Sequence, residues 1–251
     1  MNAKLDILAT VREAYSGAWT NLGEMLRLIW VPGVLYLAIS VAGAFVDPGR
    51  QLLLALVLEL AGLFLWPIIA VAWHRFILIG DAPAGSFHIA FGRREARFLV
   101  ISIFLFLLFV PGVTFVLAGE SMTQTMTSSL LSFFGLLLML VAIYFFVRLS
   151  LLLPAVSVND PFNPRLILER TRGNFWRLTA VLVLVALPIV ILGFLFGALA
   201  AGGTVLKVAV IAAFALVMVF FAVVNVAVLS VAYRELIGPA GTQPPDSGDD
   251  F

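Results

Sequence analysis

The sequence contains no cysteine and few charged residues. Without cysteine among its 251 residues, the chain has no disulfide, no thiolate metal site and no cysteine nucleophile. Charged residues make up only 12% of it, the net charge is +1, and histidine occurs twice. The motifs His-Glu-x-x-His, Gly-x-Ser-x-Gly and the phosphate-binding glycine loop are absent as well. We therefore expect no enzymatic activity, no cofactor and no nucleic-acid partner.

Apolar residues are what the sequence has in abundance. They make up 63% of the chain, whose mean hydropathy is +1.13, more than a soluble domain of this length can bury. A helix crosses a hydrocarbon core of about 30 Å with roughly 20 apolar residues, whereas the period-two alternation of a membrane β-barrel is missing. The sequence therefore predicts an all-α membrane protein with six transmembrane helices. The expected spans are Met25 to Phe45, Leu52 to Trp73, Phe98 to Ala118, Leu130 to Leu153, Leu178 to Ala200 and Val205 to Val231.

The distribution of positive charge predicts the orientation of these spans. Positively charged residues accumulate in short loops on the cytoplasmic side of a membrane. Of the fifteen lysines and arginines, only Arg50 and Lys207 fall on the opposite side. The N-terminus does not read as a cleaved signal peptide, and the excess of arginine over lysine is typical of GC-rich bacterial genomes. We expect a multi-pass protein of a bacterial inner membrane, with both termini in the cytoplasm.

A polar segment precedes each outward-going span. Its apolar residues recur at helical spacing, which predicts an amphipathic helix lying in the cytoplasmic interface before each hairpin. The three segments are Leu5 to Leu26, Ser86 to Phe98 and Asn163 to Leu178. In the third, Asn163 and Pro164 suit the cap and the first turn of a helix.

Three prolines mark corresponding places in this pattern. Pro32, Pro111 and Pro188 lie in the first, third and fifth spans, 79 and 77 residues apart, and the first two belong to the similar stretches IWVPGVLY and LFVPGVTF. Because proline removes a backbone hydrogen bond, we expect a kink at each. The pattern predicts a single domain, residues 1–237, of three pseudo-repeated helical hairpins (about 3–81, 86–160 and 163–237), and then a disordered tail, 238–251. Chance similarity among membrane hairpins is the alternative.

The segment VRLSLLLPAVSVNDPFNPRLILERTRGNFWRL, Val147 to Leu178, is the most distinctive part of the chain. It resembles the bacterial family that includes the membrane domain of glycerophosphodiester phosphodiesterases and related six-span proteins of unknown function. The resemblance is carried by Arg148, Pro154, Asp160, Arg170, Thr171, Gly173, Trp176 and Arg177. In the phosphodiesterases the chemistry belongs to a separate soluble domain, for which this chain has no room. The resemblance therefore implies a membrane module without that activity.

Glu59 is the one carboxylate well inside a predicted span, where an ionisable group is costly and often marks an ion or substrate path. A structural glutamate, hydrogen-bonded to Asn225, Tyr144 or Arg148 of other spans, is the alternative. Arg148 lies near the end of its span, either as a topology anchor or as a ligand of a lipid headgroup. These four residues form a candidate intramembrane polar site.

Seven arginines near the predicted cytoplasmic face are candidate contacts for anionic lipid or for a membrane-protein partner. They are Arg93, Arg94, Arg97, Arg165, Arg170, Arg172 and Arg177. Each charge near the surface would contribute about 1 kcal/mol to lipid binding, although the positive-inside bias alone would place most of them there. His74 and His88 lie near the same face without further ligands at a suggestive spacing, so no metal site is expected.

The sequence thus favours a non-catalytic accessory, scaffolding or lipid-organising protein, acting alone or as a subunit of a larger membrane complex. The alternative is a small transporter or lipid-translocating protein with Glu59 on its path. A polar cavity that reaches Glu59 would favour transport, whereas a lipid-facing or tightly packed Glu59 would favour a structural role.

Overall fold

The chain is helical along most of its described length. The computed structural model describes residues 4–81, 91–121, 126–199 and 204–238, in which there are ten helices and no strand. Six stretches are long and apolar enough to span a membrane, which confirms the all-α class and the number of spans. They are formed by α2 (Leu22–Gly43), α3 (Leu52–Ile79), α4 (Arg93–Leu107) with α5 (Val110–Ser121), α6 (Met126–Leu149) with α7 (Leu152–Ser157), α9 (Phe175–Leu199) and α10 (Thr204–Leu236). The other helices are α1 (Ile7–Thr20) and α8 (Pro164–Arg170).

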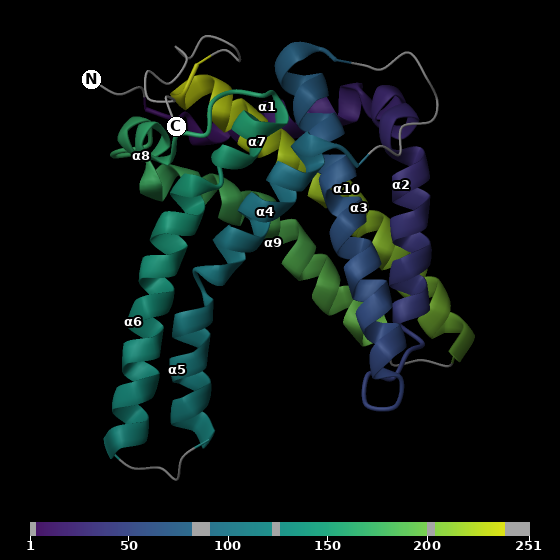
Figure 1. The fold of residues 1–251 in the computed structure, drawn as a ribbon. Helices are drawn as coiled ribbons and strands as arrows, with labels where there is room; N and C mark the ends of the chain where they lie inside the picture. The colour runs from purple at the N-terminus through teal and green to yellow at the C-terminus, as the bar shows by residue number, and fades with distance from the viewer. Residues whose placement is uncertain (1–3, 82–90, 122–125, 200–203, 239–251) are drawn as a thin grey trace.

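Consecutive spans pack as antiparallel pairs, namely α2 with α3, α5 with α6, and α9 with α10 (Figure 1). The first turns of α3, α6 and α10 lie at one end of the molecule, while α1, α7 and α8 lie at the other (Figure 1). We call this second end the platform: α1, α7 and α8, with the ends of the span helices that pack on them. The α5–α6 hairpin diverges from the group formed by α2, α3, α9 and α10 (Figure 1).

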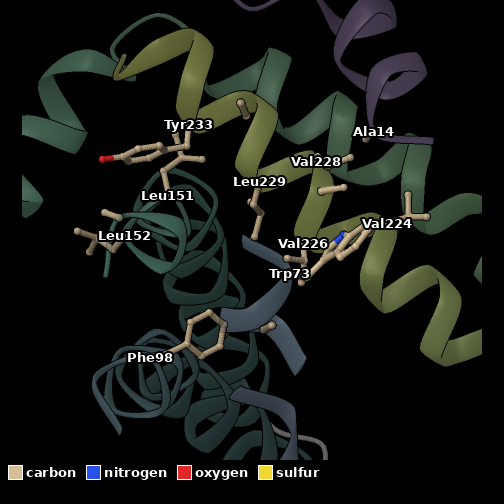
Figure 2. Packing of buried hydrophobic residues seen from close by; sticks show 14 of the residues in the cluster. Ala14, Trp73, Phe98, Leu151, Leu152, Val224, Val226, Val228, Leu229 and Tyr233 are labelled. Atoms are coloured by element: carbon tan, nitrogen blue, oxygen red, sulfur yellow. The ribbon is translucent and has the colours of Figure 1, made fainter. Parts of the chain in front are cut away.

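The hydrophobic core is concentrated in the platform. Large side chains such as Trp73, Leu151 and Tyr233 are buried there, and Figure 2 shows Trp73 of α3 beside Val226 of α10. The spans themselves are mostly exposed. Only 17% to 33% of the residues in the most apolar part of each span are buried. Side chains such as Leu53 and Phe194 point outward instead. An exposed apolar surface of this extent is stable in lipid but not in water, so the spans are suited to a membrane.

Local sequence explains where several helices begin and end. The Asp6 side chain accepts a hydrogen bond from the Ala9 amide (3.0 Å) and so caps α1. Asn163 does the same for α8 through the Leu166 amide (2.9 Å), as its position before Pro164 predicts. At its other end α3 stops at Gly80, whose φ of 65° lies in the left-handed region that glycine tolerates best.

The three segments that precede the hairpins adopt different structures. The first contains α1, which buries Thr10, Ala14 and Ala18 and leaves Leu8 and Trp19 exposed. The second lies partly outside the described residues, and from Arg93 onward it belongs to α4. The third forms only the seven-residue α8, followed by a turn and the start of α9. An interfacial helix before each hairpin therefore stays a prediction.

The three prolines also differ in their surroundings. The third span is interrupted between Leu107 and Val110, just before Pro111, and a kink at this proline stays a prediction. Pro32 and Pro188 lie inside helices that continue past them, as does Pro67, so a kink at Pro32 or Pro188 stays a prediction.

The two Val-Pro-Gly-Val stretches make different contacts. Pro32 is buried and Pro111 is exposed. A Cβ atom added to Gly33 would meet nothing within 4 Å, whereas one added to Gly112 would lie 2.5 Å from Met139 Cγ. The glycine after Pro111 therefore permits close packing of α5 on α6, a role that Gly33 does not share. The internal repeat stays a prediction, and the predicted tail lies, apart from Gly238, outside the described residues.

Candidate functional site

Arg148, near the end of α6, is buried and its guanidinium is bonded within the protein. Nε donates to Thr171 Oγ1 (3.0 Å), and the two terminal nitrogens donate to the Leu168 carbonyl and to the Tyr144 hydroxyl. The guanidinium carbon also lies 5.0 Å from the centre of the Tyr144 ring, within the range of a cation–π interaction. Arg148 thus joins α6 to the last turn of α8, whose terminal carbonyls lack helical partners. This geometry is that of a structural anchor.

The other two members of the predicted polar site lie elsewhere. Glu59 is exposed on α3. Among the residues that the structure describes, no hydrogen bond or ion pair joins it to Asn225, Tyr144 or Arg148. Asn225 is half-buried on α10, at the wall of a cavity that Glu59 does not line. Only Arg148 and Tyr144, one helical turn apart, come together as expected.

The distinctive segment forms the centre of the platform. Besides the bond between Arg148 and Thr171, the Asp160 carboxylate accepts a hydrogen bond from the Tyr233 hydroxyl (2.7 Å), which ties it to α10. Gly173 has a φ of 83°, in the left-handed region, so the turn before α9 favours glycine there. Several residues that carry the family resemblance are therefore residues that hold the platform together.

Further polar contacts attach the N-terminal segment to the platform. The Asn174 side chain accepts a hydrogen bond from the Leu5 amide (3.0 Å), and Arg177 donates to the Leu5 carbonyl (2.8 Å). Arg234, at the end of α10, pairs with Glu13 of α1. The Tyr15 hydroxyl of α1 is buried without a hydrogen-bond partner, and burial raises the pKa of this phenol above its ordinary value.

Most of the predicted lipid-contacting arginines line the outer surface of the platform. Six of them are exposed: Arg93, Arg94 and Arg97 on α4, Arg165 and Arg170 on α8, and Arg172 in the turn that follows. Arg94 donates to the Asn159 side chain (3.0 Å), and Arg177 is half-buried through its bond to Leu5. The indole of Trp176 is exposed beside them, as is usual for aromatic residues at headgroup depth.

A cavity of about 340 Å³ lies between the spans, next to the platform. Its walls come from α3, α4, α6, α7, α9 and α10, and they are mostly leucine, isoleucine and aromatic side chains. The polar residues at its surface are His74, Ser102, Ser150 and Asn225. From the sequence, Asn225 was named as a possible partner of Glu59, His74 was noted without a metal site being expected there, and Ser102 and Ser150 were not singled out.

The His74 imidazole is held in one tautomer by α10. Its Nδ1 lies 2.7 Å from Ser230 Oγ, and that hydroxyl gives its only proton to the Val226 carbonyl (3.0 Å). When the Ser230 hydroxyl bonds the Val226 carbonyl in this way, His74 Nδ1 carries the proton, and Nε2, which has no partner in the described structure, presents a lone pair. His74 and Tyr233 both precede an arginine at the end of a returning span. This shared position is the feature of the sequence that could have indicated that both rings are buried and hydrogen-bonded.

The geometry offers no metal site. Across residues 4–81, 91–121, 126–199 and 204–238, no three His, Asp or Glu side chains come close enough to hold an ion. His88 lies outside these ranges, so its relation to His74 is not described.

Six helices that are long and apolar enough to span a membrane indicate a multi-pass integral membrane protein. Comparison with protein-family models, curated proteins and solved structures finds no match.

Proposed function

We propose that the protein is a non-catalytic component of a bacterial inner membrane that organises anionic lipid at its cytoplasmic face. It would act alone or as an accessory or scaffolding subunit of a larger membrane complex, with the platform in the cytoplasmic interface. A relation to the membrane domain of glycerophosphodiester phosphodiesterases is part of this proposal. The observation that supports it best is the division among the arginines: Arg148 is bonded inside the platform, while six others remain exposed on its outer surface.

The position of the α4 arginines supports a role outside the fold. Arg93, Arg94 and Arg97 occupy the first turns of α4, where the helix dipole disfavours positive charge by about 0.3–1 kcal/mol for each residue. Helix stability therefore does not explain them. Anionic headgroups would interact favourably with such a cluster, at about 1 kcal/mol for each charge. Glu59 is exposed and does not line the cavity, so it gives no support to the transport alternative.

Lipid retention tests this proposal. The triple variant Arg93→Gln, Arg94→Gln, Arg97→Gln and the wild type are reconstituted with increasing fractions of phosphatidylglycerol, then extracted in mild detergent for native mass spectrometry. We expect the variant to retain less phosphatidylglycerol, by up to about fivefold for each charge removed. Arg50→Gln is the matched control, because this exposed arginine pairs with Asp47 at the opposite end of the molecule.

Equal phosphatidylglycerol retention by the triple variant and the wild type would overturn the lipid role. The arginines would then act only in setting the topology of the chain. Equal loss in the triple variant and in Arg50→Gln would also overturn it, because the effect would then not belong to the platform.

A further inference from the structure

We propose that the cavity beside His74 and Asn225 binds an uncharged lipid that carries a free hydroxyl group, such as a long-chain alcohol or a diacylglycerol. This inference does not depend on the proposed role of the surface arginines, because it concerns a neutral ligand and a different part of the molecule. The shape of the cavity, the hydrogen bonds of its polar residues and its lack of charged residues support this inference.

The cavity suits one end of an apolar chain. At about 340 Å³ it lies in the lower part of the range for small-ligand pockets. Its deeper wall is formed by apolar side chains, including Leu63, Ile103, Phe106 and Leu182. The polar residues lie nearer the platform, where His74 pairs with Ser230. A ligand would therefore place its polar end toward the platform and its chain toward the middle of the membrane.

The polar residues at this wall present hydrogen-bond acceptors. Ser102 and Ser150 each donate their hydroxyl proton to a carbonyl of their own chain segment (2.8 Å in both), so each offers only lone pairs to the cavity. His74 Nε2 is a third acceptor, fixed by the bond between Nδ1 and Ser230. Asn225 makes no hydrogen bond within the described residues, so its carboxamide can accept as well as donate. A ligand that satisfies this wall must donate hydrogen bonds.

Charge narrows the choice of ligand. No Lys, Arg, Asp or Glu of the described chain lines the cavity, and Arg148 is bonded to α8 instead. A phosphate or carboxylate would be buried there without a counter-ion and could not donate, while an ammonium would be buried without an anionic partner. A hydroxyl group donates one proton without carrying charge, and it therefore fits the wall best.

Asn225 is one of the more accessible polar groups of the cavity. It is half-buried, whereas the His74 ring is almost wholly buried and packs near Phe98, with ring centres 6.0 Å apart. The hydroxyl would bond to Asn225 Oδ1 on entry.

Photo-cross-linking to the full-length protein in vesicles of neutral lipid tests the site. The probe is a long-chain alcohol with a diazirine in its chain, and the competitors are the unlabelled alcohol, its methyl ether and the corresponding fatty acid. We expect cross-links on α4, α9 and α10, competed by the alcohol but only weakly by the ether or the acid. Asn225→Leu should weaken labelling about fivefold, the equivalent of one hydrogen bond of ~1 kcal/mol.

A filling substitution separates this site from general partitioning into lipid. Ala186→Phe on α9 places a ring at the cavity wall, while Ala198→Phe places one at an exposed position of the same helix outside the cavity. The first should abolish labelling and the second should leave it unchanged, with both variants melting close to the wild type. Competition by the methyl ether as strong as that by the alcohol, or labelling that survives Ala186→Phe, would overturn the proposal.

Discussion

At the scale of single residues, the buried polar groups of the platform explain how charge is tolerated next to the membrane. Arg148 is the clearest case, since its guanidinium meets a hydroxyl, a carbonyl and an aromatic ring at once. A buried cation is costly unless its donors are satisfied. Its partners also depend on it, because Thr171 and Leu168 would lose the donor that joins α8 to α6.

We expect Arg148→Gln to lower the free energy of unfolding by about 2–3 kcal/mol, because a shorter, neutral side chain leaves buried acceptors unpaired. Thermal unfolding in detergent, followed by circular dichroism, measures the effect. The control is Arg172→Gln, an exposed position in the turn after α8, which should stay within about 0.5 kcal/mol of the wild type. Similar melting of the two variants would show that Arg148 is not an anchor.

At the residue level, contacts between residues close in sequence are the ones that a sequence can indicate. Tyr144 and Arg148 are four residues apart on one helix, so their contact follows from helical geometry. The contact between His74 and Ser230 joins residues 156 positions apart, and it depends on how α3 packs against α10. Glu59 was chosen for its depth in a span. Depth does not determine which face of a helix points toward lipid.

At the scale of helices, the sequence predicted six spans because each requires a long apolar run, and the structure confirms that number. The ends were less predictable. The second span continues to Ile79, beyond Trp73, because the platform buries side chains such as His74 that hydropathy assigns to the surface. The fourth begins at Met126 rather than Leu130, since polar residues such as Ser128 are helical too.

The two Val-Pro-Gly-Val stretches allow a matched test of helix packing. We expect Gly112→Ala to destabilise the protein by about 1–3 kcal/mol, because its Cβ would lie 3.0 Å from the Gly135 carbonyl oxygen as well as close to Met139. Gly33→Ala should be neutral or stabilising by up to about 1 kcal/mol, since its Cβ meets nothing and alanine favours the helix.

Melting temperatures of the two glycine variants in the same detergent give the comparison. Equal destabilisation would mean that both glycines occupy equivalent tight positions. That result would favour the internal repeat over the packing seen in the structure.

At the scale of the whole molecule, α1 and the end of α10 lie together at the platform end (Figure 1). The absence of cysteine from the native sequence permits a clean test of its sidedness. In intact cells, Gln51→Cys should react with a membrane-impermeant maleimide, because it lies at the opposite end. Ser16→Cys, on α1, should react only after lysis, because we expect the platform to face the cytoplasm.

The reverse labelling pattern would place the platform outside the cytoplasm. It would also remove the basis for proposing contact with cytoplasmic anionic lipid.

The break before Pro111 has a consequence for how the protein responds to bilayer thickness. The α5–α6 hairpin is held internally by close glycine packing, while α4 stays with the platform. The break at Leu108 and Phe109 therefore lets α5 change its tilt relative to α4, and the hairpin stays attached to the platform at the end of α6, where Arg148 bonds to α8. A thinner bilayer should increase the tilt of this one hairpin and leave the platform undisturbed, since helices accommodate mismatch by tilting. Spin labels on α6 and α10, compared in short-chain and long-chain lipids, would record the change as a distance.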